Sequence, residues 1–128
     1  MAIPATQLIV VEKPIACSPC TVQGNIKFGK GCVIHPSASI IAENDSAIVF
    51  GDFNIIEERC MIVNKGSKSA EGKMEPTVME IGSYNLFEVG VHLESSNVGS
   101  YNTFEIRSRV ESGCKIKSGC VLGSLSTL

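Results

Sequence analysis

Apolar residues recur along this chain with a period of six. Within four groups, each member stands six residues after the one before it, and short irregular spacings separate the groups. The positions are Val22, Phe28, Ile34 and Ile40; Phe50, Ile56 and Ile62; Ile81 and Phe87; and Val98, Phe104, Val110, Ile116, Leu122 and Leu128. Six is a multiple of the strand period of two and does not match the helical period of 3.6. The repeated hexad therefore predicts an all-β protein, a parallel β-helix in which each short strand forms one wall of a coil.

A second position in the hexad supports this fold. Counting each apolar position as i and starting from Ala16, position i+4 is small in most repeats. These residues are Cys20, Ile26, Cys32, Ala38, Asn54, Cys60, Asn85, Val91, Asn102, Ser108, Cys114, Cys120 and Ser126. A three-walled coil needs tight corners, where an inward side chain has little room. We expect a single β-helix domain over residues 1–128, with about five coils of 18 residues, stacked roughly 4.8 Å apart.

A repeated string indicates which residues lie above one another. Residues 51–57, 82–88 and 99–105 share a seven-residue pattern. It begins with Gly, then Asp or Ser, then an aromatic residue and Asn, and it ends with any residue, an apolar residue and Glu. The strings begin 31 and 17 residues apart, which is one coil plus 13 residues and one coil minus one residue. We therefore expect them to stack on the same face of the prism.

This stacking predicts two ladders of like residues. The inward ladder is Asn54, Asn85 and Asn102, where buried amides can bond the turns and one another. The outward ladder is Glu57, Glu88 and Glu105. Carboxylates about 5 Å apart in water repel by roughly 0.8 kcal/mol per pair, and we expect three nearby arginines to offset this: Arg59, Arg107 and Arg109. The outward ladder is either a solvated acidic face or a docking face for a basic partner, with Glu57, Glu88, Glu105 and Arg107 as the candidate interface.

The irregular spacings predict excursions from the prism. Residues 64–77 are polar and rich in Gly, Ser and Lys, which is typical of a loop that leaves one corner. Such a loop either carries function or is a tolerated surface insertion. Residues 1–14 precede the regular hexads and are expected to form an N-terminal lead-in.

Composition and cysteine placement narrow the class of protein. The formal net charge is −2, so nothing indicates a nucleic-acid or acidic-membrane partner. No apolar run approaches the length of a membrane span, and the N-terminus lacks the pattern of a signal peptide, so we expect an intracellular protein. Cys17 and Cys20 form a CxxC without a second pair at zinc-site spacing. Five of the six cysteines fall at i+4 and are expected to be small buried thiols, which suits a reducing compartment: Cys20, Cys32, Cys60, Cys114 and Cys120.

Two enzyme classes use such prisms, and neither pattern is complete here. Hexapeptide acyltransferases need a catalytic histidine that reaches a cleft between subunits. Here His35 stands at position i+1 and is followed by Pro36 at a corner, which is typical of a residue at the edge of a coil. The γ-class carbonic anhydrases hold zinc through three histidines on successive coils. Aligning their hexads with this chain puts Val63, Val89 and Glu94 at the ligand positions, while His92 is out of phase. We expect no catalytic residues, no metal, no cofactor and no enzymatic activity.

Several segments resemble a known family. Residues 33–43, 54–58, 85–90 and 118–123 are similar to the early coils of the dynactin subunit 6 family, and the insertion and the one-residue deletion fall at matching places. The likeness runs from about residue 15 to the C-terminus. It implies a left-handed β-helix, although the usual crossover rule favours the right hand. It also implies a non-catalytic structural role in the dynactin pointed-end complex, supporting dynein-driven microtubule transport and cargo binding.

The resemblance implies partners and a location as well. The direct partner would be dynactin subunit 5, with subunit 4 and the actin-related protein of the pointed end as further neighbours and dynein as an indirect one. The location would be the cytoplasm, the cytoskeleton and the kinetochore. The family continues with a further coil and a C-terminal helix, whereas this sequence reaches Leu128 as a new coil begins, so we expect a C-terminally shortened member. The alternative is a trimer related to γ-carbonic anhydrases or hexapeptide acyltransferases, with lost or altered activity.

Overall fold

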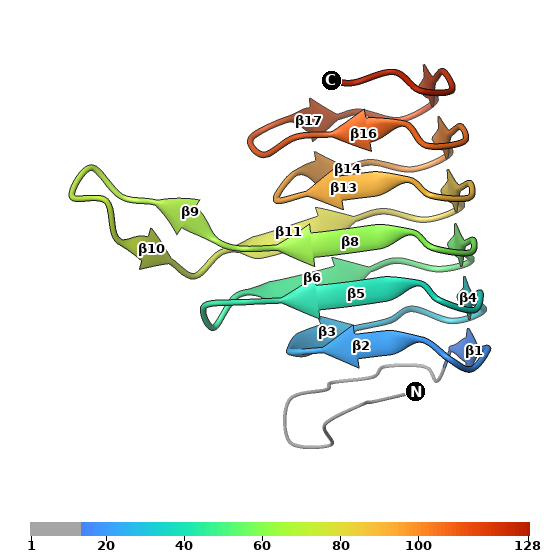
Figure 1. The fold of residues 1–128 in the computed structure, drawn as a ribbon, viewed down its shortest axis with the longest axis horizontal. Coiled ribbons are helices and arrows are strands. Elements are labelled where there is room, and N and C mark those ends of the chain that lie inside the picture. The colour runs from blue at the N-terminus through green and yellow to red at the C-terminus, as the bar shows by residue number, and fades with distance from the viewer. Residues whose placement is uncertain (1–13) are drawn as a thin grey trace.

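The computed structural model describes residues 14–128, and its strands form three parallel walls of a prism (Figure 1). The first wall consists of β1 (Ile15–Ala16), β4 (Val33–Ile34), β7 (Ile55–Ile56), β12 (Leu86–Phe87), β15 (Thr103–Phe104) and β18 (Val121–Leu122). The second wall consists of β2 (Thr21–Gln23), β5 (Ser39–Ala42), β8 (Met61–Asn64), β13 (His92–Glu94) and β16 (Arg109–Val110). The third wall consists of β3 (Asn25–Lys27), β6 (Ala47–Phe50), β11 (Val78–Ile81), β14 (Asn97–Val98) and β17 (Lys115–Ile116).

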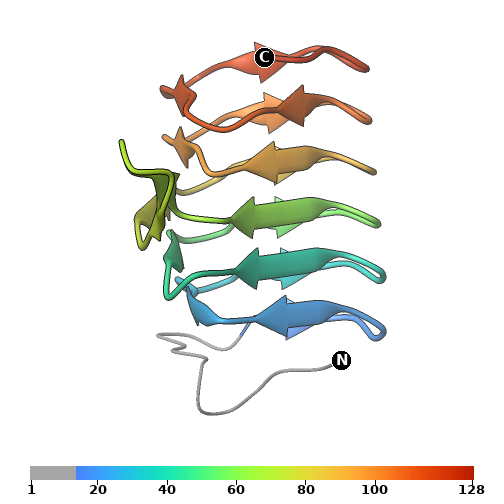
Figure 2. The ribbon, with the colours of Figure 1, turned by 60° about the vertical axis from the view of Figure 1, so that its left-hand side comes forward.

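Each coil adds one strand to each wall, and successive coils lie in layers (Figure 2). The first wall has six strands and the other two have five each, so the described chain makes five coils and begins a sixth. In Figure 1 the chain runs right to left along the front in β2, returns behind in β3 and climbs toward its C-terminus, which is a left-handed path. The predicted left-handed parallel β-helix is confirmed.

The interior of the prism is filled by the hexad residues. Every hexad residue from Val22 to Ile116 is buried. Each side chain points inward, where the residues of the other two walls and of the neighbouring coils cover it. Aromatic rings stack from coil to coil, with centroids 5.1 Å apart for Phe28 and Phe50 and 4.8 Å apart for Phe87 and Phe104. These separations match the spacing of hydrogen-bonded strands. Leu122 is half-buried and Leu128 is exposed because the last coil of the described chain has a neighbour on one side.

Buried amides hold the corner between the third and first walls. Asn85 donates from Nδ2 to Asn54 Oδ1 at 3.0 Å and to the Gly99 carbonyl at 2.9 Å. Its own Oδ1 accepts the backbone N–H of Asn102 at 3.0 Å. Asn54, Asn85 and Asn102 therefore lie one above another and bond in sequence. The amide Nδ2 of Asn102 is buried without a partner within residues 14–128.

The inserted residues 64–77 leave the prism between β8 and β11. They form an antiparallel hairpin of β9 (Ser67–Lys68) and β10 (Met74–Glu75), which projects sideways from the stack in Figure 1. Asn64 closes its base by donating from Nδ2 to the Thr77 carbonyl at 3.1 Å. Apart from Pro14, the expected lead-in over residues 1–14 lies outside the described residues. No helix among residues 14–128 is long and apolar enough to cross a membrane.

The cysteine prediction is correct for three of its five positions. Cys20, Cys32 and Cys60 are buried in the core. The prediction is wrong for Cys120, which is exposed, and only partly right for Cys114, which is half-buried. Both belong to the end of the stack, where one neighbouring coil covers less of each side chain. The six thiols are unpaired.

Candidate interaction surface

The outer face of the first wall carries a column of apolar side chains. Each strand of this wall has two residues, of which the second points into the core and the first points outward. The outward residues are Ile15, Val33, Ile55, Leu86, Thr103 and Val121. Side chains along this column reach high exposure, 40% for Ile55 and 69% for Val121. Five of the six are aliphatic and Thr103 carries a hydroxyl, and we call these six residues the aliphatic column.

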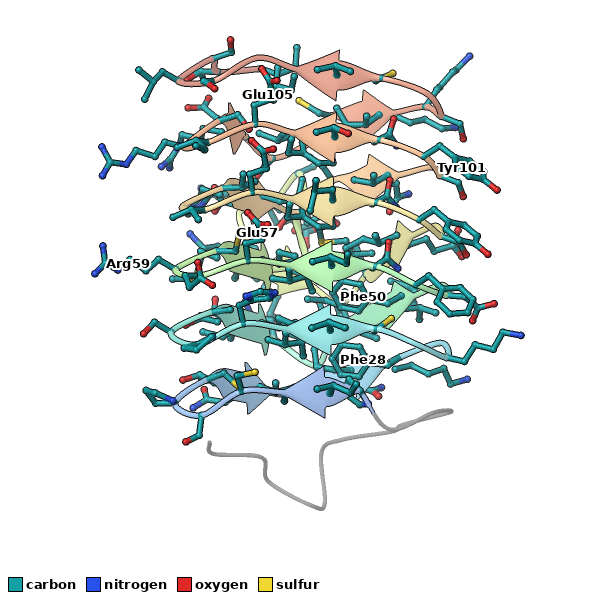
Figure 3. All side chains as sticks on the ribbon, turned by 90° about the vertical axis from the view of Figure 1, so that its right-hand side faces the viewer. Phe28, Phe50, Glu57, Arg59, Tyr101 and Glu105 are labelled. Carbon is teal, nitrogen blue, oxygen red and sulfur yellow. The ribbon has the colours of Figure 1, made fainter. Side chains whose placement is uncertain are left out.

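A ladder of aromatic rings borders the aliphatic column at the corner with the third wall. Phe53 and Tyr84 stack with ring centroids 5.3 Å apart, and Tyr84 and Tyr101 stack at 5.1 Å with planes 4° from parallel. All three are exposed, and Tyr101 lies at the edge of the wall in Figure 3. Lys30 Nζ lies 5.8 Å from the centroid of the Phe53 ring, within cation–π range. We call these three rings the aromatic ladder.

The aromatic ladder stands on a strained backbone. Phe53, Tyr84 and Tyr101 have φ angles of 54°, 58° and 58°, in the left-handed region. That conformation costs an L-residue roughly 1–2 kcal/mol relative to glycine, which adopts it freely. Stacking an aromatic pair returns about 0.5–1.5 kcal/mol. The two magnitudes are similar, so the rings add little net stability at this corner.

The predicted outward carboxylates border the aliphatic column on its other side. Glu57, Glu88 and Glu105 each follow an inward residue of β7, β12 and β15, and they lie one above another because those residues are in register (Figure 3). Their backbones bond between coils, with Glu57 N–H donating to the Phe87 carbonyl at 2.9 Å. Among residues 14–128, no ion pair involves any of these three side chains. We call them the acidic row.

The arginines expected to offset the acidic row lie elsewhere. Arg59 and Arg107 stand at the corner of the first and second walls with φ angles of 60° and 56°, and Arg59 points away from the wall in Figure 3. Arg109 belongs to β16 on the second wall, and its Nε lies 3.9 Å from Glu111. The repulsion within the acidic row is therefore not relieved by ion pairs to these arginines.

His35 lies below Glu57 at the foot of the acidic row. Its Nδ1 is 2.7 Å from Oε1 of Glu58, and both side chains are partly exposed. The ring therefore stands at the outer edge of a coil and pairs with a carboxylate from the next coil, as the coil-edge interpretation requires.

The positions compared with zinc ligands hold other interactions. Val63 and Glu94 are register partners on the second wall, and Val63 is buried. Lys65 Nζ lies 2.6 Å from Glu94 Oε1, and this hydrogen bond lowers the pKa of Glu94 while raising that of Lys65. Burial, with Arg109 nearby, lowers the pKa of His92, which favours its neutral form. Within residues 14–128, no three His, Cys, Asp or Glu side chains are grouped closely enough to hold a metal ion.

Comparison with known proteins identifies relatives of this chain, although no family model matches it. A protein from Nematostella vectensis is 38% identical over 112 residues, covering 86% of this chain and 60% of the relative. One from Danio rerio is 34% identical, covering 86% and 57%, and one from Dictyostelium discoideum is 38% identical, covering 93% and 59%. All three are dynactin subunit 6. The resemblance inferred from the motifs is confirmed, and the chain spans about three fifths of the length of these dynactin subunit 6 relatives.

Two features of the first wall were not recognised in the sequence. The aromatic ladder occupies the third position of the repeated string. The string predicted that these aromatic residues stack on one face, but it did not indicate a function for them. The aliphatic column occupies the position before each inward hexad residue of this wall. These residues form one column only when the hexads are assigned to three walls, and that assignment requires the starting residue of each coil.

Proposed function

We propose that this chain is a structural subunit of dynactin belonging to the subunit 6 family, and that it acts by docking to other proteins and not by catalysis. The observation that carries this proposal is the 34–38% identity to dynactin subunit 6 from three distant organisms over 86–93% of the chain. Each match covers at least 86% of the chain, so most of the described β-helix lies within the matched region.

The proposed neighbours are other subunits of the dynactin pointed end. Dynactin subunit 5 is the direct partner, subunit 4 and the actin-related protein of the pointed end are further neighbours, and dynein is engaged through the complex. The chain then resides in the cytoplasm with the cytoskeleton, and at the kinetochore when the complex is there. A stiff prism suits this role because it presents flat, regularly spaced walls to other proteins.

Recovery of partners from cells tests the proposal. The tagged 128-residue chain is expressed, isolated by affinity and analysed by quantitative mass spectrometry, beside the same tag on an unrelated protein. We expect dynactin subunits to be enriched, led by subunit 5. Recovery of the chain alone, as a soluble homotrimer, would overturn the proposal and favour a trimer related to the acyltransferases or γ-class carbonic anhydrases.

A further inference from the structure

We propose that the outer face of the first wall is the docking surface of this chain, and that it binds a different protein whose surface presents an aliphatic row beside a row of Lys or Arg. The inference rests on the proposed function and deepens it, because it names the wall that makes contact and the chemistry of the partner. It extends the candidate interface of Glu57, Glu88, Glu105 and Arg107 to the aliphatic column and the aromatic ladder.

The distribution of exposed apolar side chains singles out this wall. Within residues 14–128, eight of the eleven large hydrophobic side chains that are exposed lie on the first wall or at its two edges. Six of them are Ile15, Ile55, Val121, Phe53, Tyr84 and Tyr101. Of the remaining exposed hydrophobic residues, Val78 lies on the third wall and Met74 lies in the hairpin. Continuous apolar surface of this kind marks contact sites with other proteins.

The aromatic ladder gives a second reason to assign binding here. Three bulky side chains occupy left-handed corners that glycine fills elsewhere in the same column, at Gly31 below Phe53 and Gly119 above Tyr101. The chain thus has a less strained residue for this position and uses aromatic residues in three consecutive coils. Strain of this kind concentrates at functional sites, and exposed Tyr rings are favoured anchors in protein interfaces.

The acidic row specifies the charge of the partner. Three carboxylates lie one coil apart along one edge of the aliphatic column, and no cation of residues 14–128 pairs with them. A facing row of Lys or Arg would replace their mutual repulsion by attraction. A row of aliphatic side chains next to it would cover Ile55 and Leu86.

The order of the rows argues against a second copy of this chain as the occupant. Across the wall the order is aromatic ladder, aliphatic column, acidic row, then the arginine corner. Suppose that two copies bury their aliphatic columns against each other. If their prism axes are antiparallel, the two-fold axis sets one acidic row against the other. If the axes are parallel, each acidic row faces an aromatic ladder. Neither arrangement brings a basic row onto the carboxylates, so the charge pattern favours a different protein.

Matched substitutions on two walls test the proposal. Glu88→Lys and Ile55→Asp alter the first wall, whereas Glu80→Lys and Val78→Asp make the same kinds of change at exposed, outward positions of β11 on the third wall. Each tagged full chain is used to capture dynactin subunit 5 from cells, and the yield is measured by mass spectrometry. We expect at least a tenfold loss for the first-wall variants and less than a twofold change for the third-wall variants. Circular dichroism and the urea midpoint show whether each variant is folded.

The outcomes separate this inference from the proposed function. If wild-type chain and all four folded variants capture subunit 5 equally, the first wall is not the interface and this inference is overturned, while the proposed function stands. If the wild-type chain captures no dynactin subunit, the proposed function fails and the inference falls with it. If the purified chain sediments as a dimer that Ile55→Asp converts to a monomer, a second copy occupies the wall and docking to a different protein is overturned.

Discussion

At the residue scale, a side chain in this protein is held mainly by its counterpart one coil away. Asn54 Oδ1 accepts both the backbone N–H and the Nδ2 of Asn85, each at 3.0 Å. Cys60 donates from Sγ to the Glu88 carbonyl at 3.0 Å in the coil above. Asn54, Asn85 and Cys60 are thus buried where the neighbouring coil supplies a partner, which offsets the cost of burying their polar groups. Ser108 Oγ, like Asn102 Nδ2, is buried without such a partner within residues 14–128.

Asn85→Ala tests the amide ladder. The substitution leaves the Asn102 N–H without its partner. It also removes one of two donors to the Gly99 carbonyl, which keeps the Gly82 N–H at 3.2 Å. Leaving a buried polar group unsatisfied costs about 1–3 kcal/mol, so we expect the free energy of unfolding to fall by about 1–3 kcal/mol in urea titrations. Asn25→Ala, at an exposed position of β3, should stay within about 0.5 kcal/mol of wild type. Equal effects of the two substitutions would contradict a structural role for the ladder.

The thiol of Cys60 predicts a pH dependence of stability. Burial raises its pKa from 9.0 to about 11, so the folded state keeps the proton longer than the unfolded state does. The stabilisation is therefore complete below pH 9 and is lost as pH rises toward 11, by about 2–3 kcal/mol in total. We expect wild type to lose more stability than Cys60→Ala between pH 8.5 and 10.5 in urea titrations. Parallel pH profiles for the two proteins would show that the thiol is not protected in this way.

At the element scale, the strands are short and the corners fix their positions. A column of glycines marks the exit from the third wall, including Gly51, Gly82 and Gly99. A Cβ on Gly82 would lie 2.6 Å from the Gly99 carbonyl oxygen in the next coil, so glycine permits the close approach of the two backbones. The residue after Gly82 also links the two coils, since Ser83 N–H donates to Ser100 Oγ at 2.9 Å.

Gly82→Ala tests whether the close approach of the coils at this corner requires glycine, and Gly123→Ala is its control. Gly82→Ala forces neighbouring coils apart, and overpacking of this kind costs about 1–3 kcal/mol. At Gly123 the nearest atom to an added Cβ is Ser126 Oγ at 3.5 Å, an ordinary contact, so its substitution should change stability by less than about 0.5 kcal/mol. Thermal or urea unfolding of both variants measures the difference. A Gly82→Ala protein as stable as wild type would show that the coils separate without strain.

At the scale of the whole molecule, the prism is a one-dimensional stack in which each coil contacts its neighbours. The hairpin of β9 and β10 is attached to this stack at one corner and pairs with no wall strand. Asn64 pairs with Ala42 of the coil below, and Val78 pairs with Ala47. In the lower coil the same corner is closed by residues 43–46 alone.

Replacing residues 65–77 with the sequence of residues 43–46 should therefore close the third coil without the hairpin. We expect an unchanged circular dichroism spectrum, with a loss of about 1–2 kcal/mol because the two hydrogen bonds between Asn64 and Thr77 disappear. Urea titration measures the loss. An aggregated or unfolded product would show that the hairpin is needed to build the prism.

The sequence by itself determined the class of fold and the stacking of its coils. The apolar hexad and the small i+4 positions recur often enough to set which residues face inward, because burial acts on every coil in the same way. The recurrence of the string at 51, 82 and 99 also placed Asn54, Asn85 and Asn102 above one another before any contact was known.

Only the tertiary structure decided what the outer faces look like. The left-handed path, the exposure of Cys120 and the hairpin within residues 64–77 depend on how the coils close and end, which a local periodicity does not encode. The aliphatic column is recognised only when every third hexad is assigned to one wall. Arg59, which is near the acidic row in sequence, points away from the first wall, and no arginine forms an ion pair with the acidic row within residues 14–128. Inward positions repeat because the core demands the same property at each of them, whereas outward neighbours are set by which coils and walls come together in space.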